Sequence, residues 1–174
     1  MTGNSVDPFT GITENGLTVT PSGPNWLKSF TVFGNPSPFI TTDGLEVWLD
    51  VTRGGGLFRF TSVDLQDFTR DTFNNPSRYA IDGLLGGSVV FSLLGSLPNS
   101  SNWVAISSGS AMDILVDTVR VTLRRSAQDP TLATLRGLDN IVVADVPEPA
   151  SLGMLTAGLA AIALRRRRSA RTKA

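Results

Sequence analysis

Short runs of residues that alternate between apolar and polar side chains constrain the fold of this chain more than any other feature. Residues 45–51 and 118–123 alternate strictly, and a period of two is typical of a strand with one buried face. The inward positions that this pattern predicts are Leu45, Val47, Leu49 and Val51 in the first run, and Val119, Val121 and Leu123 in the second. No long stretch with a helical period of 3.6 precedes residue 150. The pattern therefore predicts a mainly β fold.

Further short apolar runs are separated by residues that favour turns. Four more strands are predicted at residues 57–60, 88–94, 103–106 and 141–143. Turn signals, rich in Gly, Asn, Asp, Pro and Ser, occur at residues 54–56, 74–77, 82–83, 86–87, 98–102 and 129–130. Residues 1–25 predict an irregular start or an edge strand, and residues 111–116 are compatible with one helical turn. Many short strands with frequent turns favour an antiparallel β-sandwich.

Composition excludes several classes of catalytic and metal site. The 174 residues, enough for one ordinary domain, contain neither cysteine nor histidine. Disulfides, Cys/His zinc sites and Ser-His-Asp triads are therefore excluded. Charged residues make up 17% of the chain, below the roughly 25% that is usual for soluble domains.

The formal net charge of zero conceals an uneven distribution. Of the 15 basic residues, six fall in the last ten positions, while all 15 acidic residues lie between Asp7 and Glu148. Residues 1–164 thus hold nine basic against 15 acidic residues, a net charge of −6. An acidic body repels phosphate, so nucleic-acid binding is not expected. The basic end points to a terminal segment with a task of its own.

The last 29 residues divide into three parts with different physical properties. Residues 146–149 contain two prolines, which end regular structure and predict an extended linker. Residues 150–164 carry no charge, and as a helix they reach ~22 Å at about 1.5 Å per residue. This is short for a bilayer core of ~30 Å. The arginines that begin the tail of residues 165–174 resist crossing and can snorkel, so we predict a short transmembrane helix with its basic end in the cytoplasm.

This ordered arrangement resembles the PEP-CTERM protein-sorting domain of Gram-negative bacteria. The resemblance covers residues 146 to about 169. It implies that Pro147, Glu148 and Pro149 form the recognition motif. It implies a membrane segment containing Gly153, Leu155, Ala157, Gly158, Leu159, Ala160, Ala161, Ile162, Ala163 and Leu164. It also implies a stop-transfer block made of Arg165, Arg166, Arg167 and Arg168.

The resemblance implies a route for the chain as well as roles for its residues. A leader exports the precursor, the C-terminal helix holds it transiently in the inner membrane, and an exosortase removes the helix and the basic tail. The mature protein then belongs to the outer envelope or the extracellular space, often beside an exopolysaccharide. Residues 1–15 contain no basic and apolar leader pattern, so we expect the true start to lie upstream of Met1.

The body, predicted to span residues 1–145, resembles the galactose-binding-like jelly-roll domains that often precede such a tail. The stretches that match are residues 58–65, 83–87 and 137–143. Stacking on a sugar ring suits an exposed aromatic face. The main candidates are Trp48 and Trp103, and the weaker candidates are Trp26 and Tyr79. Trp48 leads because it points away from the predicted inward face of its strand. The alternative, that Trp48 packs against protein groups, stays open.

The remaining polar candidates support no cofactor. Oxygens of Asp64, Asp67, Asp139 and Asn140 could hold a structural Ca²⁺, but no Asp-x-Asp-x-Asp-Gly loop is present, so we expect turn and bulge roles for them. The sequence thus predicts a non-enzymatic exported surface protein whose body binds polysaccharide. The alternative is a structural or adhesive envelope protein without a carbohydrate ligand, and a glycan-cleaving enzyme is the third class.

Overall fold

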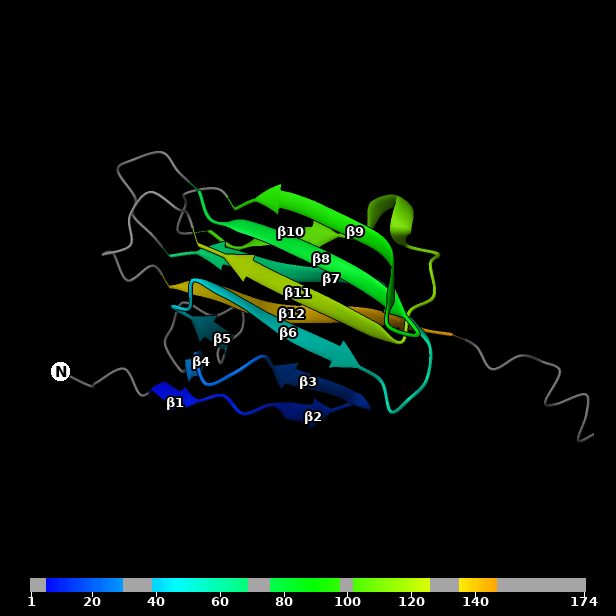
Figure 1. The fold of residues 1–174 in the computed structure, drawn as a ribbon, viewed down its shortest axis with the longest axis horizontal. Helices are drawn as coiled ribbons and strands as arrows, with labels where there is room; N and C mark the ends of the chain where they lie inside the picture. Colours follow the sequence, from blue (N-terminus) through cyan, green and yellow to red (C-terminus); the bar gives the residue numbers. More distant parts are fainter. Residues whose placement is uncertain (1–5, 30–38, 69–75, 98–101, 126–134, 147–174) are drawn as a thin grey trace, which may run out of the picture.

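Two six-stranded sheets face each other in this chain (Figure 1). The structure is a computed structural model and describes residues 6–29, 39–68, 76–97, 102–125 and 135–146. In spatial order, sheet I consists of β1 (Val6–Pro8), β4 (Trp26–Ser29), β5 (Phe39–Thr42), β12 (Arg136–Asp145), β7 (Phe58–Asp67) and β10 (Val104–Ser107). Sheet II consists of β2 (Ile12–Glu14), β3 (Leu17–Pro21), β6 (Glu46–Thr52), β11 (Thr118–Arg124), β8 (Arg78–Leu85) and β9 (Ser88–Ser96).

Every strand pairing described within these sheets is antiparallel. The chain changes sheet repeatedly, because β6, β8, β9 and β11 lie in sheet II whereas β7, β10 and β12 lie in sheet I. The predicted jelly-roll-like antiparallel β-sandwich is therefore confirmed. The short hydrophobic helix that was predicted to follow it lies outside the described residues.

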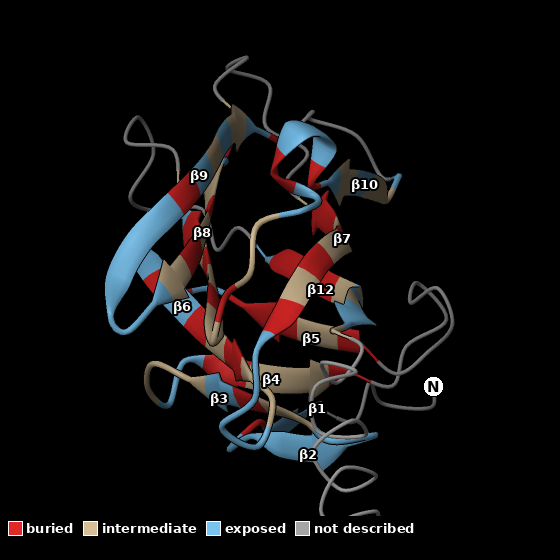
Figure 2. Ribbon diagram, turned by 90° about the vertical axis from the view of Figure 1, so that its right-hand side faces the viewer, coloured by how far each residue is buried: buried red, intermediate tan, exposed pale blue. Residues whose placement is uncertain are grey.

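The core lies between the sheets, and the alternating runs supply much of it (Figure 2). On β6, Val47, Leu49 and Val51 are buried, and on β11 the three predicted inward residues are fully buried. From sheet I, Phe58, Phe60, Val63, Leu65 and Leu138 meet them. Burying each such side chain contributes roughly 1.5–3 kcal/mol relative to leaving it in water, so the alternation stabilises the sandwich directly.

One inward assignment is wrong. Leu45 is 67% exposed and precedes the first residue of β6. A Cβ at Gly44 would overlap the side chain of Val47, so Val47 already fills the space at this end of the strand. Leu45 instead contributes its carbonyl oxygen, which accepts a hydrogen bond of 2.7 Å from the Arg125 amide.

The predicted turn at residues 82–83 is also wrong, because both residues lie inside β8. Gly83 is paired with Phe91 of β9, whose ring occupies the place of the missing side chain. The turn between these strands lies at residues 86–87, as predicted. Within residues 1–25, β1 and β2 are edge strands of their sheets. Residues 109–111 form a single 3₁₀ turn that overlaps the first residue of the ambiguous stretch at 111–116.

The last strand, β12, leads out of the sandwich. It begins five residues earlier than its predicted apolar run and ends at Asp145, which pairs with Phe58 at the start of β7. No helix within the described ranges is long and apolar enough to cross a membrane. The predicted linker and recognition motif from Pro147 onward, the membrane segment and the arginine block lie outside these ranges.

Candidate ligand-binding surfaces

The outer side of sheet II presents an aromatic side chain among polar ones. Trp48 is 38% exposed and lies opposite Thr122 of β11, which in turn lies opposite Ala80 of β8. In the next row of the same face, Asp50, Arg120 and Asp82 lie side by side on the same three strands. We call these six residues the Trp48 face. They share it because side chains two apart on a strand point to the same side.

Arg120 holds this surface together. Its Nε donates to Asp50 Oδ1 at 2.7 Å and its Nη2 donates to Asp50 Oδ2 at 2.8 Å. Its guanidinium carbon lies 5.3 Å from the centre of the Trp48 ring, within the range of a cation–π interaction. The hydrogen bond to Asp50 raises the pKa of Arg120. The indole is thereby fixed beside a permanent positive charge.

The backbone of Trp48 is fixed from the other side by Ser22, the residue that follows β3. The Trp48 amide donates to Ser22 Oγ at 3.0 Å, and the Ser22 amide donates to the Trp48 carbonyl oxygen at 2.9 Å. Sequence reasoning found Trp48 but missed Asp50 and Arg120. The signal was available, because Asp50 follows Trp48 by two residues on the polar side of the same alternating run.

The other aromatic candidates lie elsewhere. Trp103 is half-buried and contacts Phe39 and Phe68 edge-on, at ring-centre distances of 5.4 and 6.0 Å. A Cβ at Gly137 would lie 2.8 Å from the Trp103 ring, so the indole also covers β12. Trp26 is fully buried in the core, which removes it as a surface candidate. Sugar stacking at Trp48 and Trp103 stays a prediction.

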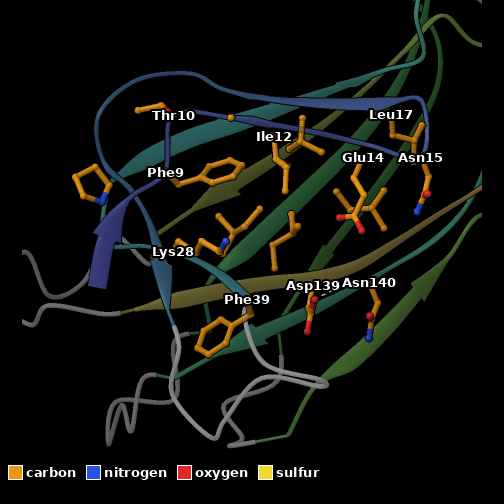
Figure 3. Close-up of a pocket in the computed structure, with 16 residues that line it drawn as sticks. Phe9, Thr10, Ile12, Glu14, Asn15, Leu17, Lys28, Phe39, Asp139 and Asn140 are labelled. Carbon is orange, nitrogen blue, oxygen red and sulfur yellow. Dashed lines mark hydrogen bonds between the residues drawn. The ribbon is translucent and has the colours of Figure 1, made fainter. Parts of the chain in front are cut away.

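A groove opens between the two sheets on the side of β2 and β3 (Figure 3). Its volume is about 890 Å³. The apolar lining includes Phe9, Val19, Phe39 and Leu138, all buried. The polar lining residues are Thr10, Glu14, Asn15, Lys28, Asp139 and Asn140. We call this the inter-sheet groove, and it combines an apolar wall with few polar groups, as ligand sites commonly do.

Two local backbone features shape the groove. Gly11 has a φ of 117°, and a Cβ there would lie 2.9 Å from the Val19 carbonyl oxygen, so only glycine allows this approach to β3. Across the groove, Asn140 has a φ of 47° at a register shift between Asp139 and Val142 of β12. Asparagine tolerates this left-handed conformation better than most residues.

Three of the four calcium candidates gather at this bulge. Asn140 Nδ2 donates to Asp64 Oδ2 at 2.9 Å, and the Asn140 amide donates to Asp139 Oδ1 at 2.9 Å. Asp67 is separate and accepts from the Ser77 amide at 3.2 Å. In the ranges that the structure describes, no three His, Cys, Asp or Glu side chains are grouped as a metal site.

Comparison with known families identifies the C-terminal segment. Residues 145–168 match the PEP-CTERM protein-sorting motif. The match begins at Asp145, the final residue of β12. No curated protein gives a significant match to the chain.

Solved structures with a similar chain path include several carbohydrate-binding modules. The family 32 module of C. perfringens NanJ, in complex with galactose, is 15% identical, with a TM-score of 0.46, and covers 75% of this chain and 98% of its own. TmCBM61, in complex with β-1,4-galactotriose, is 9% identical at a TM-score of 0.47, covering 76% and 90%. The C-terminal domain of a Bacteroides fragilis chitobiase is 10% identical at 0.41, covering 78% and 99%. Galactose and β-1,4-galactotriose are ligands of the first two of these proteins.

Proposed function

We propose that this chain is the precursor of an exported envelope or extracellular protein, which an exosortase releases from the inner membrane. The observation that carries the proposal is the PEP-CTERM match at residues 145–168, together with its start at the final residue of the last strand of a folded sandwich. A sorting signal in this position can be removed without disturbing the core. The mature product then lacks the uncharged segment of residues 150–164.

Expression in two hosts, one with and one without an exosortase, tests the sorting step. The host with the enzyme should yield a chain that lacks the peptides beyond the recognition motif, whereas the other should yield the uncut precursor. A Glu148→Ala precursor should stay uncut in both, while Glu14→Ala, which changes a glutamate of the body, should be cut normally. Identical C-terminal peptide masses in both hosts would contradict the proposal.

For the body, we propose that the Trp48 face binds a polysaccharide. The support is physical: a fixed and partly exposed indole suits the apolar side of a sugar ring, and Asp50, Arg120, Asp82 and Thr122 offer hydrogen bonds next to it. The face is an open sheet surface, which suits binding along the middle of a polysaccharide chain rather than at its end. The binding role needs no catalysis, so we propose a non-enzymatic body.

A glycan array followed by binding measurements tests this role. Trp48→Ala should weaken binding by about tenfold, since stacking and lost apolar contact amount to ~1.4 kcal/mol. Leu45→Ala is the matched control, because Leu45 is exposed and lies outside the Trp48 face. Unchanged binding in Trp48→Ala would mean that the sugar binds elsewhere, and the inter-sheet groove would be the next site to test. No binding to any glycan would favour the alternative, a structural or adhesive envelope protein.

A further inference from the structure

The end of the sandwich from which β12 leaves is built from four chain segments that lie together (Figure 1). Asp145 pairs with Phe58, and Arg53, in the loop after β6, forms an ion pair with Asp145. Phe58 and Val116 exchange backbone hydrogen bonds of 2.9 and 3.0 Å. These contacts join the end of β12 to the loop between β6 and β7 and to the segment before β11.

The turn between β8 and β9 belongs to the same end. The Asp117 amide donates to the Leu84 carbonyl oxygen at 2.9 Å, and the Gly86 amide donates to Asp117 Oδ2 at 2.6 Å. The turn is thus tied to the segment that also holds Phe58. Because each loop is bonded to its neighbour, this end presents a defined surface rather than separate loops.

Three exposed apolar side chains lie on or directly beside these loops. Leu57 is 44% exposed, Leu85 is 42% exposed and Met112 is 56% exposed. Leu57 directly precedes Phe58, and Leu85 directly precedes the Gly86 turn, so two of the three flank the residues that make the contacts above. We call Leu57, Leu85 and Met112 the exit surface.

The distance from this surface to the predicted membrane segment is limited by the length of chain between them. Four residues, 146–149, separate Asp145 from the uncharged stretch of residues 150–164. A fully extended chain spans at most ~3.6 Å per residue, about 14 Å here. The headgroup layer on one side of a bilayer takes up roughly 5–7 Å of this, as the difference between total and core thickness. The shortness of the apolar stretch reduces this distance further. A helix of ~22 Å is shorter than the bilayer core of ~30 Å, so the residues that flank it are drawn toward the membrane.

We propose that the exit surface rests on the lipid headgroup layer while the precursor is held in the membrane. The inference depends on the proposed function, since it requires residues 150–164 to be inserted. The lipid surface is the occupant because the chain leaves the fold at this end with so short a tether. Leu57, Leu85 and Met112 then dip into the interface, where exposed apolar side chains are favoured.

The charges at this end of the sandwich indicate which lipids the exit surface can contact. Arg53 is paired with Asp145, and Asp113 and Asp117 lie on the segment between Met112 and β11. Among the residues that the structure describes at this end, there is therefore no excess of positive charge to attract anionic lipids. Contact should occur on zwitterionic phosphatidylcholine and should not be strengthened by anionic lipid.

Single cysteine substitutions test this contact cleanly, because the chain contains no cysteine. The full chain is placed in phosphatidylcholine vesicles containing a headgroup-labelled nitroxide lipid, and a fluorophore is attached at Leu57→Cys, Leu85→Cys or Met112→Cys. The controls are Leu45→Cys and Leu94→Cys, which are 67% and 74% exposed and lie away from the exit surface. Carbonate extraction of the same samples reports whether the tail is inserted.

With the tail inserted, quenching by the nitroxide lipid should be at least threefold stronger at the three exit positions than at the two controls. Equal quenching at all five positions in carbonate-resistant samples would overturn the inference and leave the proposed function standing. The inference is also overturned if the stronger quenching at Leu57 and Leu85 appears only with added exosortase or grows with the ratio of protein to lipid. The surface would then contact the enzyme or a second copy of the chain. Chains released by carbonate would overturn the insertion step, and with it both this inference and the proposed sorting route.

Discussion

At the scale of single residues, glycine positions in β8 and β9 show how neighbouring strands fit together. A Cβ at Gly83 would overlap the ring of Phe91, and one at Gly95 would overlap the ring of Tyr79. Each aromatic ring thus lies over the backbone of the strand beside it. The sequence suggested a turn at Gly83 because an Asp-Gly pair is a common turn signal, whereas the structure uses this glycine for close packing.

Gly83→Ala should therefore destabilise the fold. Adding a methyl group forces the Phe91 ring to move, and overpacking of this kind costs about 1–3 kcal/mol. The control is Gly23→Ala, because a Cβ at Gly23 meets nothing within 4 Å. Urea unfolding followed by tryptophan fluorescence measures both free energies of unfolding. Equal stability of the two variants would contradict the packing seen at Gly83.

The Glu46 carboxylate provides a second test at this scale. It accepts hydrogen bonds from Arg124 Nη2 at 2.7 Å and Nε at 3.1 Å, and these bonds lower the pKa of Glu46 from its ordinary value. Because the pKa of Glu46 is lowered in the folded state, the ion pair stabilises the fold at pH values above the pKa of Glu46 in the unfolded chain. This stabilisation is lost as the pH falls through the pKa of Glu46 in the folded chain. An NMR titration should show a low pKa for Glu46 that returns to its ordinary value in Arg124→Gln. An unchanged pKa in that variant would contradict the pairing.

At the scale of elements, strands that alternate strictly were predictable and interrupted ones were not. The runs at residues 45–51 and 118–123 match β6 and β11 to within one residue. In β12 only residues 141–143 were predicted, because the bulge at Asp139 and Asn140 breaks the alternation. The short strands β4 and β5 were missed because they bury polar residues, Ser29 in β4 and Thr41 and Thr42 in β5, so no apolar run marks them. Strand β8 was hidden by its glycine.

The bulge in β12 should tolerate glycine but not a β-branched residue. Asn140→Gly keeps the left-handed backbone accessible and loses the bond to Asp64, so we expect a cost of about 1 kcal/mol. Asn140→Val adds steric strain at positive φ, which costs on the order of 1–3 kcal/mol more. Thermal unfolding of the two variants measures the difference. A valine variant as stable as the glycine variant would mean that Asn140 does not hold this conformation.

At the scale of the whole molecule, the two-sheet sandwich and the separate C-terminal segment follow from patterning and charge, but the order of strands does not. Which strands lie side by side depends on contacts between residues far apart in the sequence, such as Arg120 with Asp50. The Trp48 face shows this limit. Its tryptophan was found from alternation within one strand, whereas its arginine comes from another strand, and only the pairing of β6 with β11 brings them together.

The central claim is that the sandwich is delivered by its C-terminal segment and then separated from it. The most direct test is the intact mass of the protein in the membrane and extracellular fractions of its native host. We predict an extracellular form that retains β12 and lacks the uncharged segment and the arginine block, beside a longer precursor in the membrane. A full-length chain confined to the cytoplasm, with Arg165 to Arg168 still attached, would contradict the account.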